Sequence, residues 1–209
     1  MIIAYFKQYT STTKGSISVG QSALSLKLTF SLLSSSSLLF LLSEISFLGG
    51  TLRKYVEDGG PVSEKTCAAF GKDLLLAVKF VHEEAGIVHR DIHASNILLD
   101  EHRTYVKLAD FGLAQAIQED TPFRRSFDDN WKIGCVLLFM LNGEISPLFD
   151  ERDPDERERM EAVNPEQHFP TSASREMLEL LNLIFGVGRE QLPSAAEILR
   201  VATIFNRHA

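Results

Sequence analysis

The chain has 209 residues, of which 44% are hydrophobic and 23% are charged, and its formal net charge is −7 at pH 7. This length and apolar content are enough for one large domain with a packed core, and the negative charge argues against a broad nucleic-acid surface. The two cysteines, Cys67 and Cys135, lie far apart in the sequence, which argues against a disulfide scaffold and is typical of the reducing cytoplasm.

The N-terminal quarter has an unusual composition, because Leu, Ser and Phe dominate it. Residues 2–10 are rich in strand-forming and aromatic side chains, and a Ser-, Thr- and Gly-rich loop follows. Residues 28–43 carry no charge, but this run is shorter than the roughly 20 apolar residues of a membrane span and contains Ser34–Ser37. We therefore predict buried strands around a Ser-rich loop rather than a membrane helix, and no secretion signal.

From Ser63 onward the hydrophobic pattern is helical. Ser63 precedes a long run with apolar residues at helical spacing, and Gly86 follows it, so an amphipathic helix is predicted between them. Two short apolar runs, residues 97–99 and 106–109, predict a hairpin that turns through residues 100–103. The apolar positions of the helix are Ala68, Phe70, Leu74, Leu75, Val78, Phe80 and Val81.

Further helices are predicted toward the C-terminus. Residues 131–141 are almost all apolar, which indicates a helix buried on every side. Residues 150–161 mix acidic and basic side chains and predict a solvated loop and surface helix. Residues 174–185 predict an amphipathic helix, and Pro193 lies near the start of a last helix that continues through Leu199.

Two polar motifs flank the predicted hairpin. The first is His89-Arg90-Asp91-Ile92-His93-Ala94-Ser95-Asn96, and the second is Asp110-Phe111-Gly112. Their order and separation resemble the catalytic loop and the metal-binding loop of eukaryotic protein kinases of the Ser/Thr type. Each residue alone would be an ordinary turn or cap residue, so the joint pattern carries the resemblance.

By this resemblance, the two motifs supply the base and the metal ligands of a phosphotransfer site. Asp91 would accept the hydrogen bond of the incoming hydroxyl, and Asn96 and Asp110 would hold Mg2+ against the phosphates of ATP, because oxygen ligands suit this hard cation. Leu98 would pack under the adenine, and Glu44 would lie in the hinge that touches it. Structural support would come from His89, Arg90, Phe111, Gly112 and Asp129, with Arg90 pairing with a phosphate on the activation segment.

Asp129 has two compatible interpretations. The segment Asp129–Cys135 resembles the start of the central helix of the kinase large lobe, in which the Asp anchors the catalytic loop through backbone hydrogen bonds. The alternative is an ordinary N-cap at the start of that helix.

The resemblance implies an α+β fold with a mostly helical large lobe and a partial small-lobe β-sheet. Residues 1–48 would form the partial small lobe and hinge with a Ser-rich insertion, and residues 49–209 the large lobe. Gly49-Gly50-Thr51-Leu52 resembles the hinge exit of kinases related to the mitogen-activated cascade. The implied activity is ATP-dependent phosphorylation of protein Ser or Thr, and the implied partners are a protein substrate or signalling partner. The net charge argues against a nucleic-acid partner, and the short apolar run argues against a membrane.

Departures from the kinase pattern predict that activity is impaired in this chain. Residues 1–48 contain no Gly-rich phosphate loop and no lysine within Val-Ala-x-Lys, and both belong to the phosphate clamp that turnover needs. Between Thr121 and Asp129 the usual Ala-Pro-Glu motif is absent, and Leu192 stands where its arginine partner would be. Losing both partners of a buried ion pair can be nearly neutral for stability.

His93 is a further departure, because Ser/Thr kinases usually place there a lysine that meets the transferred phosphate. We treat it as a candidate catalytic residue: a protonated His93 could donate a hydrogen bond, although an imidazole is mostly uncharged at neutral pH. A loop histidine without a catalytic role is the alternative. For the chain as a whole we consider three hypotheses, namely a Ser/Thr kinase whose true chain is longer, a non-catalytic pseudokinase that binds partners, and a fragment that is not stable alone.

Overall fold

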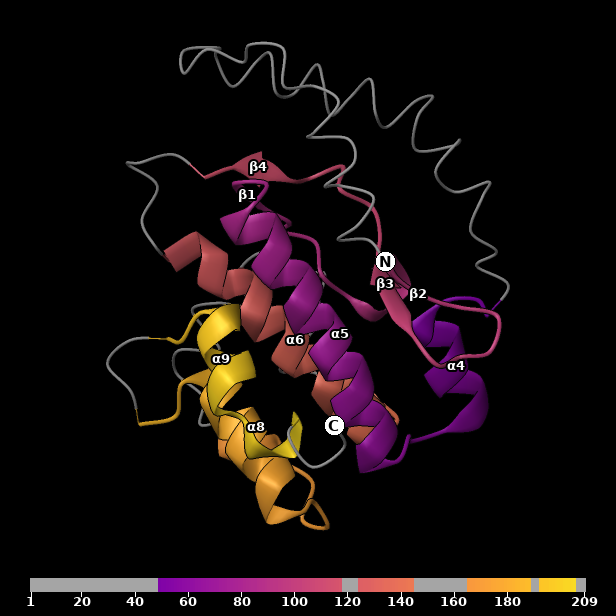
Figure 1. The fold of residues 1–209 in the computed structure, drawn as a ribbon. Coiled ribbons are helices and arrows are strands. Elements are labelled where there is room, and N and C mark those ends of the chain that lie inside the picture. The colour runs from indigo at the N-terminus through magenta and orange to yellow at the C-terminus, as the bar shows by residue number, and fades with distance from the viewer. Residues whose placement is uncertain (1–48, 118–123, 145–164, 189–191, 206–209) are drawn as a thin grey trace, which may run out of the picture.

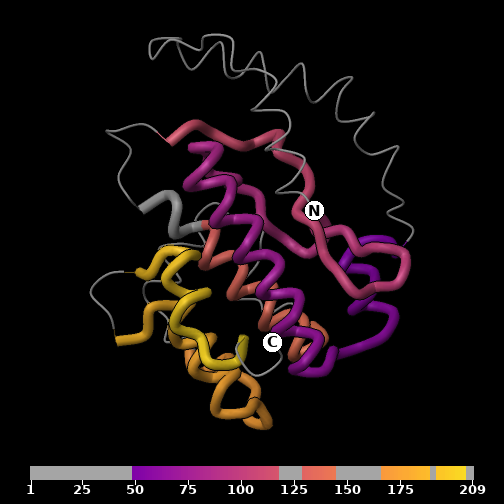
Figure 2. Tube along the Cα trace, viewed as in Figure 1, coloured from indigo at the N-terminus to yellow at the C-terminus, as the bar shows by residue number. Residues whose placement is uncertain are grey.

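The computed structural model describes residues 49–117, 124–144, 165–188 and 192–205. Two long helices, α5 (Glu64–Glu83) and α6 (Arg124–Asn142), pack side by side at the centre of this part of the chain (Figure 1). The C-terminal helices pack on one side of this pair, and α4 with a β-hairpin lies on the other side (Figure 2). The remaining helical elements are α4 (Leu52–Gly59), η2 (Ala94–Asn96), η4 (Pro165–His168), α8 (Arg175–Phe185), α9 (Ala195–Val201) and η5 (Thr203–Phe205).

Helix α5 confirms the prediction made from the apolar spacing. All seven predicted apolar positions are buried. The Oγ atom of Ser63 accepts the N–H of Thr66 at 3.2 Å, so Ser63 is the N-cap. The helix ends at Glu83, and Gly86 follows with a φ of 65°, a left-handed conformation that glycine adopts without strain.

The predicted hairpin is also confirmed. Strands β2 (Ile97–Leu99) and β3 (Val106–Leu108) pair antiparallel, with Ile97 opposite Leu108, and β3 ends one residue earlier than expected. The Asp100 side chain holds the turn, because it accepts the N–H groups of Thr104 and Tyr105, each at 2.7 Å. Short local hydrogen bonds of this kind explain why the turn forms at Asp100.

A second small sheet, which the sequence analysis did not predict, forms from two strands that flank the polar motifs in the sequence. Strand β1 (Ile87–Val88) pairs antiparallel with β4 (Gln115–Ala116), and Val88 lies opposite Gln115. Strand β1 comes directly before the first motif and β4 comes shortly after the second. The fold is therefore α+β, mostly helical with small antiparallel sheets, as predicted.

Helix α6 is the buried central helix, and none of its residues from Trp131 to Leu141 is exposed. It begins at Arg124, earlier than the motif at Asp129 indicated, so Asp129 lies inside the helix and the N-cap interpretation is wrong. Gly134 lets α8 approach closely, because a Cβ there would lie 2.6 Å from Cζ of Phe185.

The two predicted C-terminal helices form as α8 and α9. The Oγ atoms of Ser174 and Ser194 cap them, and Pro193 lies just before the second cap. The backbone N–H of Ser174 also donates to Oε1 of Glu64 at 2.7 Å, which fastens the start of α8 to the start of α5.

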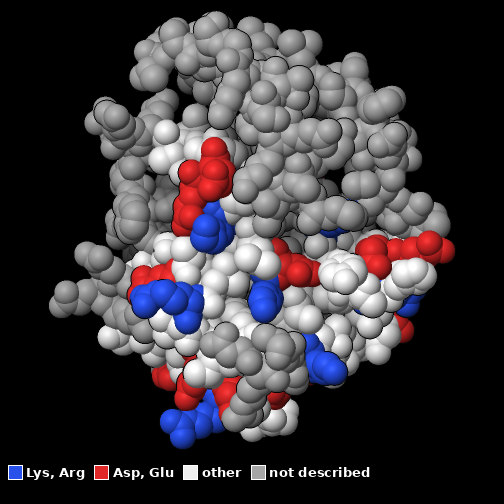
Figure 3. All heavy atoms as spheres, in the orientation of Figure 1, with Lys and Arg blue, Asp and Glu red and all other residues white. Residues whose placement is uncertain are grey.

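Several predictions fall outside the described residues: the N-terminal strands and loop, the hinge with Glu44, the segment around Thr121 and the charged stretch 150–161. Among the helices that the structure describes, none has the length and apolar character needed to cross a membrane. Acidic and basic side chains of the described residues are interspersed on the face drawn in Figure 3.

Candidate functional site

The buried carboxylate of Asp129 anchors the loop that carries the first motif. Its Oδ2 accepts the N–H of His89 and its Oδ1 accepts the N–H of Arg90, both at 2.8 Å. Asp129 is 1% exposed, and Nε2 of His82 on α5 lies 2.8 Å from the same Oδ2. Arg90 is exposed and has a φ of 71°, an uncommon conformation for a residue with a side chain. The two hydrogen bonds that Asp129 accepts hold the backbone at this unusual turn.

The ring of His89 connects the first motif to the second. Its Nδ1 accepts the N–H of Asp91 at 3.3 Å, and its Nε2 donates to the carbonyl oxygen of Ala109 at 3.0 Å. The ring also contacts Phe111, with 4.5 Å between the ring centroids. Burial lowers the pKa of His89, although the Asp129 carboxylate opposes this shift. A neutral ring with its proton on Nε2 satisfies both contacts.

Asn96 and Asp91 form the centre of the site. The Nδ2 atom of Asn96 donates to Oδ2 of Asp91 at 2.9 Å and to its carbonyl oxygen at 3.0 Å. Both bonds use Nδ2, and no described residue forms a hydrogen bond with the Oδ1 atom of Asn96. The carbonyl oxygen of Asn96 accepts the N–H of Ala109 at 2.8 Å, which brings the residue before Asp110 against this pair.

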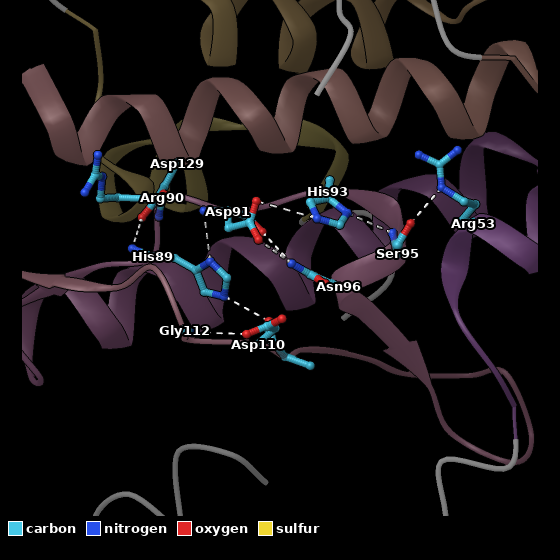
Figure 4. Close-up of polar contacts among 11 residues, drawn as sticks. Arg53, His89, Arg90, Asp91, His93, Ser95, Asn96, Asp110, Gly112 and Asp129 are labelled. Atoms are coloured by element: carbon cyan, nitrogen blue, oxygen red, sulfur yellow. Dashed lines mark hydrogen bonds and ion pairs between the residues drawn. The ribbon is translucent and has the colours of Figure 1, made fainter. Parts of the chain in front are cut away.

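Asp110 completes the set of oxygen-bearing side chains. Its side chain is drawn near the Asp91–Asn96 pair in Figure 4, and the residue is exposed. Asp110 has a φ of 58°, and its Oδ1 accepts the N–H of Gly112 at 3.1 Å. A Cβ at Gly112 would lie only 3.0 Å from that oxygen, so glycine keeps the carboxylate accessible.

The donor set suits magnesium bound together with phosphates. No group of three or more His, Cys, Asp or Glu side chains within the described residues could hold a metal ion on its own. Magnesium, however, is commonly held by one or two protein oxygens together with the phosphates of a nucleotide. Oδ1 of Asn96 and the exposed carboxylate of Asp110 are two such oxygens, so the residues present fit this cation.

Leu98 lies at the junction of the hairpin and α4. It is half-buried, pairs with Lys107 across the hairpin, and forms a bridge with Thr51. The N–H of Leu99 donates to the carbonyl oxygen of Gly50 at 2.9 Å, so the segment expected at the hinge exit runs along β2.

Three residues with contacts in the site, His82, Arg53 and Ser95, were not predicted from the sequence. His82 reaches Asp129 from α5, and Nε of Arg53 on α4 donates to Oγ of Ser95 at 2.7 Å. Neither His82 nor Arg53 belongs to a local motif, and Ser95 had been given no role. His93, for which two interpretations were left open, lies between Ser95 and Asp91 (Figure 4).

Residues 27–128, which include both motifs, match the family described as "Protein kinase domain". With both motifs inside this match, the chain belongs to the eukaryotic protein kinase family.

Several curated relatives of the chain are named as serine/threonine-protein kinases. A probable serine/threonine-protein kinase of Dictyostelium discoideum is 30% identical over 75% of this chain and 35% of its own length. A serine/threonine-protein kinase of Saccharomyces cerevisiae is 29% identical over 72% of this chain and 15% of its own. A mitogen-activated protein kinase kinase kinase of Arabidopsis thaliana is 31% identical over 46% of this chain and 17% of its own. The chain thus spans about a third or less of these relatives.

Proposed function

We propose that this domain provides the large-lobe part of a site for ATP-dependent phosphorylation of protein Ser or Thr. The observation that carries the proposal is the Asn96 amide, which uses Nδ2 to hold Asp91 and leaves Oδ1 for a cation. One side chain thereby sets the distance between the base and the metal position. Membership in the kinase family and the Ser/Thr kinases among its relatives support this choice of reaction.

In this proposal each residue has a defined task. Oδ1 of Asn96 and the carboxylate of Asp110 hold Mg2+, which neutralises charge on the transferred phosphate when it is bound with ATP. Asp91 accepts the hydrogen bond of the substrate hydroxyl and so directs its oxygen for attack. Leu98 lies under the adenine, with Glu44 in the hinge. His89 and Asp129 keep the two loops together.

Magnesium-dependent nucleotide binding by the purified 209-residue chain tests the proposal. Replacement Asp110→Ala removes one cation ligand, and losing a charge-assisted contact of about 1.5–3 kcal/mol weakens affinity by about 10- to 150-fold. Glu101→Ala is the matched control, because it removes an exposed carboxylate from the hairpin turn. Binding of ATP that is independent of magnesium, or equal in the two variants, would refute the proposed site.

The 209-residue polypeptide is expected to bind nucleotide but to transfer little or no phosphate. The alternative is a non-catalytic pseudokinase that binds partner proteins, and the absence of an Ala-Pro-Glu motif between Thr121 and Asp129 favours it. Binding without phosphate transfer would support that alternative. Transfer by this polypeptide that is abolished in Asp110→Ala would reject it.

The proposed partners are a protein substrate or a signalling partner, and not a nucleic acid, because the net charge is −7. A cytoplasmic location is part of the proposal, supported by two cysteines that form no disulfide. The proposed division of the chain places the small-lobe remnant and hinge in residues 1–48 and the large lobe in residues 49–209.

A further inference from the structure

A row of polar contacts runs from α4 to the side chain of Asp91. The Nε atom of Arg53 donates to Oγ of Ser95 at 2.7 Å, and the N–H of Ser95 donates to Nδ1 of His93 at 3.3 Å. The Nε2 atom of His93 lies 3.6 Å from Oδ1 of Asp91. Figure 4 shows these four side chains one after another along the loop. The row joins a helix outside the motifs to the proposed base.

The bond from Ser95 determines which nitrogen of His93 carries the proton. A backbone N–H that points at Nδ1 needs a lone pair there, so the neutral ring has its proton on Nε2. His89 shows the same arrangement, because its Nδ1 accepts the N–H of Asp91, two residues further on, and its Nε2 donates to a carbonyl oxygen. The two histidines of the loop are therefore held in the same tautomer by equivalent backbone contacts.

We propose that His93 is a positioning residue for Asp91, and that Arg53 and Ser95 hold its ring in place. The Nε2–H of His93 faces Oδ1 of Asp91, while Nδ2 of Asn96 donates to Oδ2 at 2.9 Å. Each carboxylate oxygen thus has one N–H group directed at it, and the pair fixes the plane of the carboxylate once the contact from His93 shortens to a hydrogen bond. The separation of 3.6 Å exceeds a hydrogen bond, and such contacts commonly shorten when substrate binds. This inference rests on the proposed function, in which Asp91 is the base.

Burial of the ring favours the neutral form of His93, and the charges around it act in both directions. Burial lowers the pKa of His93; Asp91 and Asp110 raise it, whereas Arg53 and Lys132 lower it further. A protonated ring would carry hydrogen on Nδ1 and would lose the bond from Ser95. The positioning role therefore requires the neutral ring, unlike the phosphate contact that a lysine makes.

Arg53 provides the connection to α4. Its side chain is 21% exposed and also pairs with Glu57 one turn further along the helix, at 3.3 Å. Because Ser95 lies next to Asn96, a shift of α4 would act on His93 and on the magnesium ligand together. Lys54, the neighbouring residue, pairs instead with Asp58 at 2.9 Å on the exposed face of α4, which makes it a matched comparison.

Nitrogen-15 NMR of the histidine side chains in the 209-residue protein tests the proposal, with His93→Gln to assign the signal. We expect His93 to carry its proton on Nε2 above its pKa. Arg53→Met should produce a mixture of tautomers, because Ser95 loses the side chain that holds it in place. Arg53→Lys, which keeps the charge and a donor, should restore much of the original signal, and Lys54→Met should leave it unchanged.

A proton on Nδ1 in the wild-type protein would overturn the proposal, and this measurement needs no variant that might fail to fold. Equal responses to Arg53→Met and Lys54→Met would overturn the role of Arg53. The signal is recorded without nucleotide. A chain that binds no ATP but keeps the Nε2–H tautomer would therefore refute the proposed function and not the arrangement of His93.

Discussion

The Nε2 atom of His82 and the Oδ2 atom of Asp129 lie 2.8 Å apart, although the residues are 47 positions apart and belong to different helices. The same carboxylate accepts the N–H groups of His89 and Arg90. In Asp129→Ala these donors lose their acceptor inside the protein, so we expect the free energy of unfolding to fall by about 1–3 kcal/mol. Urea denaturation measures this change.

Asp58→Ala is the control for loss of a carboxylate. Asp58 is 65% exposed and pairs with Lys54 on the surface of α4, where such pairs contribute about 0–1 kcal/mol. An Asp129→Ala protein as stable as Asp58→Ala would contradict the anchoring role of Asp129.

Two glycines in helices are expected to respond oppositely to alanine. A Cβ at Gly134 would lie 2.6 Å from Phe185 and 2.9 Å from Ile184, whereas a Cβ at Gly59 meets nothing within 4 Å. We expect Gly59→Ala to stabilise the protein by about 0.4–1 kcal/mol, because it restricts the unfolded chain. Gly134→Ala should destabilise it by about 1–3 kcal/mol through overpacking. Denaturation midpoints of the two variants that shift in the same direction would contradict the close packing of α6 on α8.

His89 should make stability depend on pH. Burial lowers the pKa of His89 in the folded protein, whereas in the unfolded chain the ring takes up its proton near pH 6.5. The folded protein is therefore protonated at His89 only at a lower pH. The unfolded state then binds more protons, so this contribution is present above about pH 6.5 and is lost as the pH falls. In His89→Gln the slope of unfolding free energy between about pH 7 and 5 should be smaller, by at most about 1.4 kcal/mol per pH unit. Identical slopes for variant and wild type would argue against a buried neutral ring.

The two cysteines should differ in reactivity. Burial raises the pKa of the Cys67 thiol, with a smaller contribution from Glu64, and its side chain is inaccessible. Cys135 is half-buried. Because the thiolate is the reactive form, an alkylating reagent should modify Cys135 in the native protein and Cys67 only after denaturation. Mass spectrometry locates the label, with Cys135→Ser as the control. Rapid native labelling of Cys67 would contradict its burial.

Local signals in the sequence predicted most of the described fold. Ser63 and Ser174 each precede an apolar pattern of helical spacing, and each caps a helix. The hairpin was predictable because Asp100 supplies its own turn contacts within five residues. The start of α6 was not, because an apolar run marks the part of a helix that is buried and not the residue at which the helix begins.

Contacts between distant residues were only partly predictable. The two loops and Asp129 were found through family resemblance, and the structure brings them together. His82 and Arg53 were missed because their partners lie 47 and 42 positions away, and neither residue stands in a recognisable local pattern. The tautomer that we infer for His93 could not be predicted from the sequence either, because it depends on the backbone N–H of Ser95 that points at Nδ1.

The pairing of β1 with β4 closes the chain between Val88 and Gln115 into a ring that contains both polar motifs and the hairpin. A segment fastened at both ends cannot fray from one side. Its amide hydrogens should therefore exchange with solvent as a cooperative unit. A substitution at Ile87 or Ala116 that disrupts the strand pairing should increase the exchange rates of both loops equally.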